Sequence, residues 1–347
     1  MRPDDEVADF LVTQGFVTRA ADAGRTPLTG GISSDLWRVD LPGRSICVKR
    51  ALPRLRVAAD WRAPLSRNAY ECAWLRFAAT HRPDNVPALL AQDTDAGLFA
   101  MTYLPPHRYP GWKGQLLAGD VDPVVAAAVG DLLGSLHAAG AGDEELAKEF
   151  ASDDNFHALR IEPYLLATAA AHPALGDRLR ALAERTARTR LAVVHGDVSP
   201  KNILIGPAGP VLLDAECAWY GDPAFDLAFC LNHLLLKTLV VPARRTALLD
   251  SARALTRAYL ARCTWEPPAG VAHRAATLLP ALSLARVDGK SPVEYLTEPL
   301  RAFVRRVVPA LLRGSPPAVT DVLDAWQAAL TPFPIRRTQE NPCPPPN

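Results

Sequence analysis

The stretch VVHGDVSPKNIL, residues 193–204, sets a histidine, an aspartate and an asparagine among strand-like apolar runs. Polar side chains are costly to bury unless they find hydrogen-bond partners. His195, Asp197 and Asn202 therefore need a reason for standing so close together. The residues that follow, NILI and PVLLD around the turn GPAGP, predict a β-hairpin that ends at Asp214.

The predicted hairpin decides how these polar residues are arranged. A hairpin brings its end back to near its beginning, so Asn202 and Asp214 are expected together, next to Asp197. Carboxylate and amide oxygens gathered in this way suit a Mg²⁺ ion that keeps some of its waters. The spacing H-x-D-x₄-N, followed by an aspartate one hairpin later, is that of phosphoryl transfer in protein kinases. As an alternative, Asp197 and Asn202 would only satisfy backbone groups of a turn.

The region before position 105 supplies a possible phosphate-binding turn. Residues 26–50 predict strands that are joined by a tight Pro-Gly turn. An earlier turn in the same region contains Gly30, Gly31 and Ser33, and its backbone N–H groups could face phosphates. A plain hairpin turn explains the glycines equally well, so this signal needs support from elsewhere in the chain.

That support comes from a lysine and a glutamate. The run ICVKR places Lys49 inside a predicted strand, as VAIK does in kinases, although a strand lysine can also simply face solvent. Glu71 lies on the helix predicted for residues 67–81, with Ser66 as its N-cap. In kinases a glutamate on a helix positions the phosphate-binding lysine. The order of these features along the chain therefore favours a phosphotransferase.

The remaining pattern divides the chain into two parts and a tail. Residues 1–104 predict a small sheet with one helix, including two strands around an Asp-rich turn. Residues 105–335 predict mainly helices, one of which starts at Pro123 with Asp122 as its N-cap. Residues 336–347 are polar and rich in proline, and we expect them to be disordered.

Three strings of the chain also resemble a known family. HGDVSPKNIL, LLDAE and GDPAFDLAF are similar to the aminoglycoside phosphotransferase and choline kinase superfamily of small-molecule kinases, and the resemblance runs from about residue 26 to about residue 300. It implies a two-lobed, protein-kinase-like α+β fold, with a small β-rich N-terminal lobe and a larger, mainly helical C-terminal lobe. It also implies ATP and Mg²⁺ as cofactors.

The resemblance implies a role for each residue of the pattern. Asp197 would be the catalytic base that orients the acceptor hydroxyl. Asn202 and Asp214 would hold the metal ions that bridge the ATP phosphates. Lys49 would contact these phosphates, and Glu71 would orient it.

Further residues take roles from the same resemblance. The run MTYL would form the hinge between the lobes, and its backbone would bind adenine through Met101, Tyr103 and Leu104. Asp226 would tie down the metal-binding loop. Lys201 could reach the transferring phosphoryl group as a point charge, although an exposed loop lysine is an equal alternative.

One departure concerns the metal-binding loop. Protein kinases have glycine two residues after the metal aspartate, whereas this chain has Glu216. The resulting D-x-E string is similar to that of methylthioribose kinase. Glu216 would either help to hold the metal or accept a hydrogen bond beside it.

Two other functions can be weighed against a small-molecule kinase. A peptide kinase is disfavoured, because only eleven residues separate Asp214 from Asp226 and no A-P-E triplet follows. A non-catalytic nucleotide-binding protein of the same fold would be expected to lack a base or metal residue, yet all are present. We therefore favour an ATP-dependent phosphotransferase acting on a hydroxyl of an aminoglycoside, amino alcohol or sugar.

The sequence leaves the acceptor open. Residues 142–163 carry seven acids, which could form an acidic wall for a polycation but are explained more simply as a solvated charged loop. The string SPVE at residues 291–294 has capping-box spacing and predicts a helix start. Nearby Arg286, Asp288 and Lys290 would either reach the cleft, to bind a sugar or carboxylate, or lie at the surface.

Some other polar residues have simple explanations. His137, on an apolar helix, is expected to be a structural histidine with its hydrogen bonds satisfied. A solvated face explains the basic run of the N-terminal part, although these side chains could also approach phosphates; its members are Arg50, Arg54, Arg56, Arg62 and Arg67.

The composition excludes several classes of function. The formal net charge of +1 gives no global field that would draw the chain to nucleic acid or to a membrane. The six cysteines are widely spaced without a C-x-x-C pair, which indicates reduced thiols. No signal-like segment or membrane-spanning run is evident. We therefore expect a cytoplasmic monomer or homodimer whose partner is a small-molecule hydroxyl acceptor.

Overall fold

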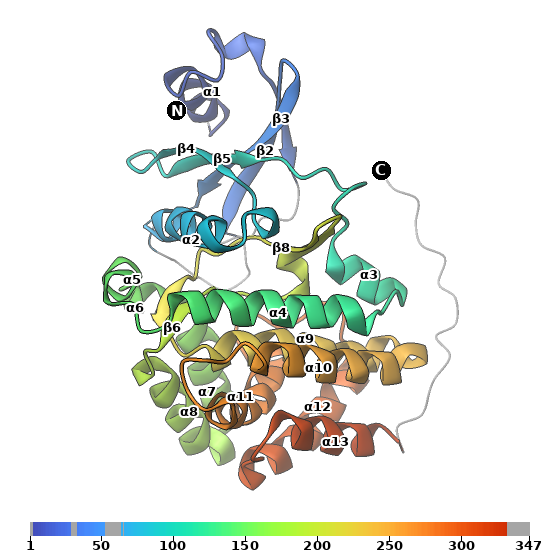
Figure 1. Cartoon of the computed structure of the whole chain (residues 1–347). Helices are drawn as coiled ribbons and strands as arrows, with labels where there is room; N and C mark the ends of the chain where they lie inside the picture. Colours follow the sequence, from blue (N-terminus) through green and yellow to red (C-terminus); the bar gives the residue numbers. More distant parts are fainter. Residues whose placement is uncertain (1–2, 29–32, 53–63, 65, 332–347) are drawn as a thin grey trace.

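The computed structural model describes residues 3–28, 33–52, 64 and 66–331 (Figure 1). Its N-terminal part contains an antiparallel five-stranded sheet in the order β1-β2-β3-β5-β4. The strands are Gly24–Leu28 (β1), Ser34–Leu41 (β2), Arg44–Ala51 (β3), Leu89–Asp93 (β4) and Leu98–Thr102 (β5). The tight turn predicted between β2 and β3 is present.

Two helices accompany this sheet, where the sequence predicted one. α1 (Pro3–Thr13) packs an apolar face that includes Phe10 into a cluster with sheet residues such as Trp37. α2 (Arg67–His81) lies on the other side of the sheet, facing the helical part of the molecule (Figure 1). Ser66 occupies the N-cap position of α2, as predicted, but it has helical backbone angles and its side chain makes no capping hydrogen bond.

The rest of the described chain is mainly helical, which confirms the predicted α+β class with a small β-rich part and a larger helical part (Figure 1). Its helices are α3 (Trp112–Ala118), α4 (Pro123–Gly140), α5 (Glu144–Glu149), α6 (Asp153–Phe156), a π-helix (His157–Leu166), α7 (Ala167–Ala171), α8 (Gly176–Arg188), α9 (Ala224–Val240), α10 (Arg245–Leu260), α11 (Pro268–Asp288), α12 (Glu298–Gly314) and α13 (Val319–Leu330).

Helix α4 begins as the sequence predicted. The side chain of Asp122 accepts a hydrogen bond from the backbone N–H of Val124, and Pro123 occupies the first turn. α4 is also long and apolar enough to span a membrane, contrary to our reading of the sequence, but half of it is buried. It packs closely on α10, where a Cβ added at Gly130 would lie 2.2 Å from the carbonyl oxygen of Leu255. Core packing therefore explains its apolar character.

Four short strands position the loop at residues 195–202. β7 (Ile203–Gly206) and β8 (Gly209–Leu212) form the predicted hairpin, with Ile203 opposite Leu212. β6 (Ala192–Val194) pairs instead with β9 (Trp219–Gly221). The 195–202 loop thus lies between a strand anchored to β9 and a hairpin, and both of its ends are held by sheet hydrogen bonds.

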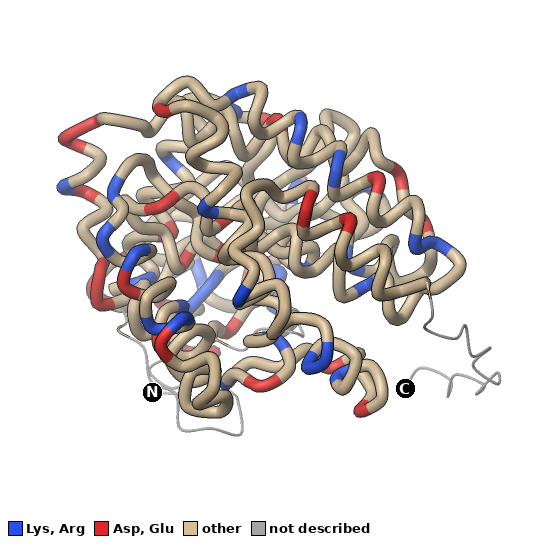
Figure 2. The backbone as a smooth tube through the Cα atoms, turned by 90° about the horizontal axis from the view of Figure 1, so that it is seen from below, with Lys and Arg blue, Asp and Glu red and all other residues tan. Residues whose placement is uncertain are grey.

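The surface and the cysteines agree with the composition. Lysine and arginine are interspersed with aspartate and glutamate along the backbone, as expected for a net charge near zero (Figure 2). Within the described residues the cysteines are buried free thiols: Cys47, Cys72, Cys217, Cys230 and Cys263. Cys343 lies outside the described residues, as does the tail at 336–347.

Candidate active site

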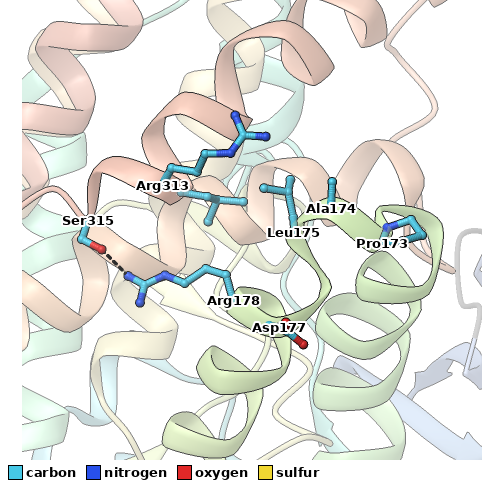
Figure 3. Close-up of a pocket in the computed structure, with 8 residues that line it drawn as sticks. Pro173, Ala174, Leu175, Asp177, Arg178, Arg313 and Ser315 are labelled. Atoms are coloured by element: carbon cyan, nitrogen blue, oxygen red, sulfur yellow. Dashed lines mark hydrogen bonds between the residues drawn. The ribbon is translucent and has the colours of Figure 1, made fainter.

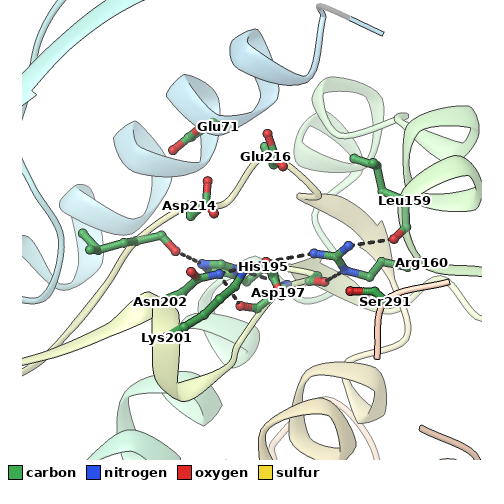
Figure 4. A network of polar contacts seen from close by, with 12 residues as sticks. Glu71, Leu159, Arg160, His195, Asp197, Lys201, Asn202, Asp214, Glu216 and Ser291 are labelled. Atoms are coloured by element: carbon green, nitrogen blue, oxygen red, sulfur yellow. Dashed lines mark hydrogen bonds and ion pairs between the residues drawn. The ribbon is translucent and has the colours of Figure 1, made fainter. Parts of the chain in front are cut away.

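A cleft of about 770 Å³ lies between the sheet part and the helical part of the chain. Lys49 from β3 and Glu71 from α2 line one side of it, and Asp197, Asn202 and Asp214 line the other. Figure 4 shows the carboxylates of Glu71 and Asp214 near the loop that carries Asp197 and Asn202. Residues separated widely in the sequence are therefore gathered at one site.

Lys49 joins the two parts of the molecule. Its Nζ donates hydrogen bonds to both carboxylate oxygens of Glu71, at 2.8 and 2.6 Å, and also pairs with the carboxylate of Asp214. Burial alone would lower the pKa of Lys49, but the nearby carboxylates of Asp214 and Glu71 raise it above its usual range. Burial raises the pKa of Glu71 to about 7, against the opposing charge of Lys49. Lys49 is therefore a permanent cation at the head of the cleft.

Asp214 is held in an unusual backbone conformation. Its φ of 67° lies in the left-handed region, which aspartate tolerates better than most residues do. Burial would raise the pKa of its carboxyl group, but the charges of Lys49 and Lys201 lower it below its usual range. The turn after β8 thus presents an ionised carboxylate to the cleft.

The loop at residues 195–197 is fastened from beneath by Asp226. The carboxylate of Asp226, on α9, accepts hydrogen bonds from the backbone N–H groups of His195 and Gly196 at 2.7 and 2.8 Å. His137 approaches the same carboxylate at 3.2 Å and also bonds the Tyr259 hydroxyl, as expected of a structural histidine. Asp226 thus anchors the loop that carries Asp197, whereas the sequence resemblance had assigned it to the metal-binding loop.

His195 links two loops and has a neutral ring. Its Nδ1 accepts a hydrogen bond from the backbone N–H of Asp197, and its Nε2 donates to the carbonyl oxygen of Leu213, each at 3.1 Å. Burial lowers the pKa of His195, and only the neutral ring can accept at Nδ1. His195 therefore holds the loop of Asp197 against the residue before Asp214, which answers why it stands in this stretch.

The carboxylate of Asp197 is almost fully buried and is held from several sides. Its Oδ2 lies 3.0 Å from Nη2 of Arg160, 2.8 Å from Nδ2 of Asn202 and 3.5 Å from Nζ of Lys201. Asn202 also donates to the backbone carbonyl of Asp197 at 3.0 Å. Because the amide nitrogen of Asn202 donates to Asp197, its side-chain carbonyl oxygen is the atom that could bind a cation. The charge of Asp197 raises the pKa of Lys201, which lies partly exposed at the cleft.

Arg160 is a site residue that the sequence analysis missed. It comes from the π-helix His157–Leu166 and is buried, with its guanidinium 5.5 Å from the ring centres of Tyr164 and Phe229. Besides Asp197, it bonds the backbone carbonyl of Gly196. A lone arginine in an acidic segment gave no signal for this role, because only packing brings the π-helix to the loop.

Glu216 is paired with a second buried arginine. Its carboxylate lies 3.0 Å from Nε of Arg67, a fully buried side chain at the start of α2. The interpretation of the basic run as a solvated face is therefore wrong for Arg67, which is buried. Arg50 pairs with Glu6 at 2.9 Å, and the other members of that run lie outside the described residues.

No ready-made metal cage exists in the described part of the chain, where no three histidine, cysteine, aspartate or glutamate side chains converge on one point. Two oxygen-bearing side chains that line the cleft could hold a cation: the ionised carboxylate of Asp214 and the carbonyl oxygen of Asn202. This suits Mg²⁺, which is usually held by one or two carboxylates together with substrate phosphates. Glu216 stays a predicted ligand, since its described partner is Arg67.

Only some of the residues predicted to bind nucleotide line the cleft in the described structure. Ser33 lines the cleft, and its carbonyl oxygen accepts a hydrogen bond from Arg67 at 2.7 Å. Met101, on β5, also lines it. Tyr103 and Leu104 are not among the residues that line the cleft, and the Tyr103 ring lies 5.2 Å from the Arg38 guanidinium. Gly30 and Gly31 lie outside the described residues.

The residues near position 290 separate into site and surface. Arg286 lines the cleft, whereas Asp288 pairs with Arg305 and His172, and Lys290 pairs with Glu162 at 2.7 Å. The helix predicted to start after Ser291 is wrong, because α12 begins only at Glu298. The hydroxyl of Ser291 accepts a hydrogen bond from Arg286 instead of capping a helix.

The acidic segment at residues 142–163 is helical and does not form an acidic wall. Asp143 caps α5 through the backbone N–H groups of Glu145 and Leu146. All seven acids of the segment are described, and none of them lines the cleft; its contributions there are Leu159 and Arg160. Capping, surface exposure and ion pairs such as that of Glu162 with Lys290 explain these acids.

A second hollow, of about 330 Å³, lies away from these residues (Figure 3). It is formed by the start of α8 and the end of α12, where Arg178 donates to the Ser315 hydroxyl at 2.7 Å. None of the predicted site residues lines it. Of these two hollows, the larger is therefore the one that predicted site residues line.

Comparison with known proteins shows which family the sequence matches. The sequence model of the phosphotransferase enzyme family matches residues 24–265. Methylthioribose kinase 1 of Oryza sativa subsp. japonica is 26% identical over 223 residues, which are 55% of this chain and 51% of that protein. Methylthioribose kinase of Klebsiella pneumoniae (strain 342) is 24% identical, over 57% and 55%. The chain thus spans about half the length of the curated relatives it matches.

Solved structures share the fold at low sequence identity. A choline/ethanolamine kinase family protein from Mesorhizobium loti has a TM-score of 0.51 at 18% identity and covers 93% of this chain and 99% of its own. The amicoumacin kinase hAmiN has a TM-score of 0.54 at 14% identity and covers 92% and 98%. These likenesses confirm the predicted two-lobed, protein-kinase-like architecture.

Proposed function

Because the chain belongs to the phosphotransferase enzyme family, we propose that it is a small-molecule kinase that moves the γ-phosphate of ATP to a hydroxyl group of its acceptor. The observation that carries this proposal is the ion pairing of Lys49 with Glu71 and Asp214 in the cleft that also contains Asp197. This is the lysine–glutamate–aspartate arrangement on which phosphoryl transfer depends. Residues 1–104 would act as the nucleotide lobe and residues 105–335 as the catalytic and acceptor lobe.

Asp197 is the proposed catalytic base. Three contacts fix its carboxylate, so it is oriented before the acceptor arrives. The acceptor oxygen forms a bond to the γ-phosphorus, the bond from that phosphorus to the bridging oxygen of ADP breaks, and the hydroxyl proton passes to Asp197. Lys201 and Lys49 would balance the charge of the phosphoryl oxygens in transit.

The proposed nucleotide substrate is the magnesium complex of ATP. Asp214 and the carbonyl oxygen of Asn202 would hold its ion, which neutralises phosphate charge when bound. The ionised state of Asp214 supports this role. Met101, which lines the cleft, would contact adenine, and Tyr103 and Leu104 would continue the hinge beyond it. Gly30, Gly31 and Ser33 would cover the phosphates. ATP as substrate fits a cytoplasmic protein.

The proposed acceptors are the hydroxyl-bearing molecules of this family's chemistry: sugars, amino alcohols or aminoglycosides. The methylthioribose kinases among the relatives support a sugar, but they match only part of their length to this chain. No observation favours a non-catalytic nucleotide-binding protein, because every residue of the predicted set is present.

A D197N variant tests the proposal. We expect it to lower the rate of ADP formation by about 10²- to 10⁴-fold with whichever acceptor is active, because it removes the base. Binding of Mg²⁺–ATP should persist, as a thermal shift can verify. D250N, a substitution of an aspartate that is 52% exposed on α10, serves as control. Near-normal phosphorylation by D197N would contradict the role, and nucleotide binding without transfer to any acceptor would favour the non-catalytic alternative.

A further inference from the structure

The wall of the cleft formed by α9, the end of α11 and residues 291–295 is not used by the proposed phosphoryl transfer. Lys237, on α9, lines the cleft and is only 1% exposed. Its Nζ lies 5.1 Å from the ring centre of Tyr295. No carboxylate in the described part of the chain forms an ion pair with it. A buried lysine without a counter-ion is costly, so packing alone explains it poorly.

Arg286 is the second cation of this wall, and its partners are neutral. It donates to the Tyr164 hydroxyl at 3.1 Å, to the Ser291 hydroxyl at 2.8 Å and to the backbone carbonyl of Ser291. Its Nε is buried without a hydrogen-bond partner among the described residues. The guanidinium is therefore oriented by its neighbours, but its charge is not balanced by them.

Two further polar atoms of the same wall lack partners. The Nε2 of His233 and the hydroxyl of Tyr295 are both buried without a hydrogen bond in the described structure. Both residues line the cleft. Buried polar atoms are nearly always bonded to something, so two unsatisfied ones in a cleft indicate a ligand or ordered water between them.

The carboxylates that line the cleft are already paired. Glu71 and Asp214 face Lys49, and Asp197 faces Arg160. Glu216 faces Arg67, and Glu294 faces Lys113. Lys201 also lies 3.5 Å from Asp197, and Lys49 faces two carboxylates, so these charges balance one another. Among the described residues that line the cleft, Lys237 and Arg286 are the cations without a carboxylate partner, so the wall is positive whenever Lys237 is protonated. An ammonium group of an aminoglycoside or amino alcohol would be repelled there.

We infer that the acceptor is a hydroxylated small molecule that carries an oxyanion, such as a carboxylate or phosphate group, which binds between Lys237 and Arg286. The inference rests on the proposed function and names its substrate class. The oxyanion fills the space beside His233 and Tyr295, which supply further hydrogen bonds, and it is unchanged by the reaction. The hydroxyl group at the other end of the molecule faces Asp197.

The protonation of Lys237 supports this geometry. Burial, and then the charge of Lys113, lower its pKa to about 7. The charge of Arg286 is part of this lowering, and Cys230 and Glu294 oppose it. The group therefore exchanges its proton near neutral pH in the free protein, and an oxyanion bound beside it favours the charged form.

A K237M variant tests the inference by binding. The protein is saturated with AMP-PNP and Mg²⁺ and titrated calorimetrically with three classes of probe: anionic (D-glycerate, gluconate, ribose 5-phosphate), neutral (ribose) and cationic (choline, kanamycin). We expect at least one anionic probe to bind, and K237M to weaken its binding by about tenfold or more, the usual effect of a lost charge-assisted hydrogen bond. The carboxylate and phosphate probes separate the two oxyanions.

Controls separate a binding effect from a folding effect. Methionine fills a similar volume, so K237M should unfold at the same temperature as the wild type or higher, because a buried charge is removed. R286M should weaken the binding of the same anionic probe. K148M, at a lysine side chain that is 69% exposed on α5, should leave all binding unchanged.

The outcomes distinguish this inference from the proposed function. Binding of neutral or cationic probes alone, or equal binding of the anion by wild type and K237M, would overturn the anionic acceptor. Transfer of phosphate from ATP to a neutral or cationic probe only would do the same while supporting the kinase. Anion binding that depends on Lys237, without phosphate transfer to any probe, would support the anion site and count against the kinase.

Discussion

At the scale of single residues, the site depends on backbone positions as much as on side chains. Gly196, between His195 and Asp197, has a φ of 77°. A Cβ added there would lie 2.5 Å from the carbonyl oxygen of Cys217. Only glycine fits both the conformation and the space, and this allows Asp226 to reach two successive N–H groups.

A G196A variant should therefore be strongly destabilised. We expect the free energy of unfolding to fall by more than the roughly 1–2 kcal/mol that a left-handed alanine costs, because of the added contact with Cys217. Urea unfolding measures it. Gly142 provides a matched control, since its φ is 71° but its added Cβ would meet nothing within 4 Å. G142A should lose only the conformational part, and equal losses in both variants would argue against the clash.

At the scale of elements, short pieces of structure deliver the key side chains. The β7–β8 hairpin brings Asn202 and Asp214 to one end, and the π-helix turns Arg160 onto Asp197. α9 serves two purposes, because its first turn supplies Asp226 and its later turns supply His233 and Lys237. The helix that anchors the loop of Asp197 thus also contributes to the proposed anion site.

His233 on α9 should make stability depend on pH. Burial, and then the charges of Arg286, Lys237, Lys201 and Lys113, lower its pKa well below 6.5. Below pH 6.5, His233 therefore binds a proton in the unfolded chain but stays neutral in the folded protein. Its contribution to stability is therefore complete above pH 6.5 and is lost as pH falls, at up to about 1.4 kcal/mol per pH unit.

An H233L variant tests this dependence. We expect the free energy of unfolding to depend less steeply on pH between pH 6.5 and pH 5. The slope should decrease by up to about 1.4 kcal/mol per pH unit, the value for one proton, as urea titrations at several pH values can measure. H107L, at an exposed histidine, is the control and should keep the wild-type slope. An unchanged slope in H233L would mean that His233 already binds its proton when folded.

At the scale of the whole molecule, the two parts meet through charges that cross the cleft. Lys49 on β3 pairs with Asp214 beyond β8, and Arg67 on α2 pairs with Glu216. Both carboxylates lie on the same short loop, so that loop is held from the sheet side. A nucleotide bound there would contact both parts and stabilise the protein as a unit.

A D214N variant should lose this link to the nucleotide. For the wild type, Mg²⁺–ATP at about 100 times its Kd should add about 2.7 kcal/mol to stability and raise Tm. We expect D214N to lose the magnesium-dependent part of that shift, because its amide cannot replace the carboxylate charge at the ion. D250N should shift like the wild type, and a full magnesium-dependent shift in D214N would contradict the metal role.

The sequence by itself determined the local parts of the site. It predicted the hairpin that brings Asn202 and Asp214 together near Asp197. It also predicted the strand that carries Lys49 and the helix that carries Glu71. They follow from turn residues and side-chain periodicity, which act within a few positions along the chain. The family resemblance then predicted the two-lobed fold.

Only the tertiary structure decided which side chains meet across the chain. Neither Arg160 nor Lys237 gave a local signal, because their surroundings come from elements that only packing brings near. Arg67 belonged to a basic run, but its burial beside Glu216 depends on the same packing. The SPVE string and Ser66 show that a local pattern can also predict a contact that the fold does not form. Both patterns predicted a capping serine, yet Ser291 accepts a hydrogen bond from Arg286 and Ser66 makes no capping hydrogen bond. A cap motif offers about 1 kcal/mol, which contacts from the rest of the fold can outweigh.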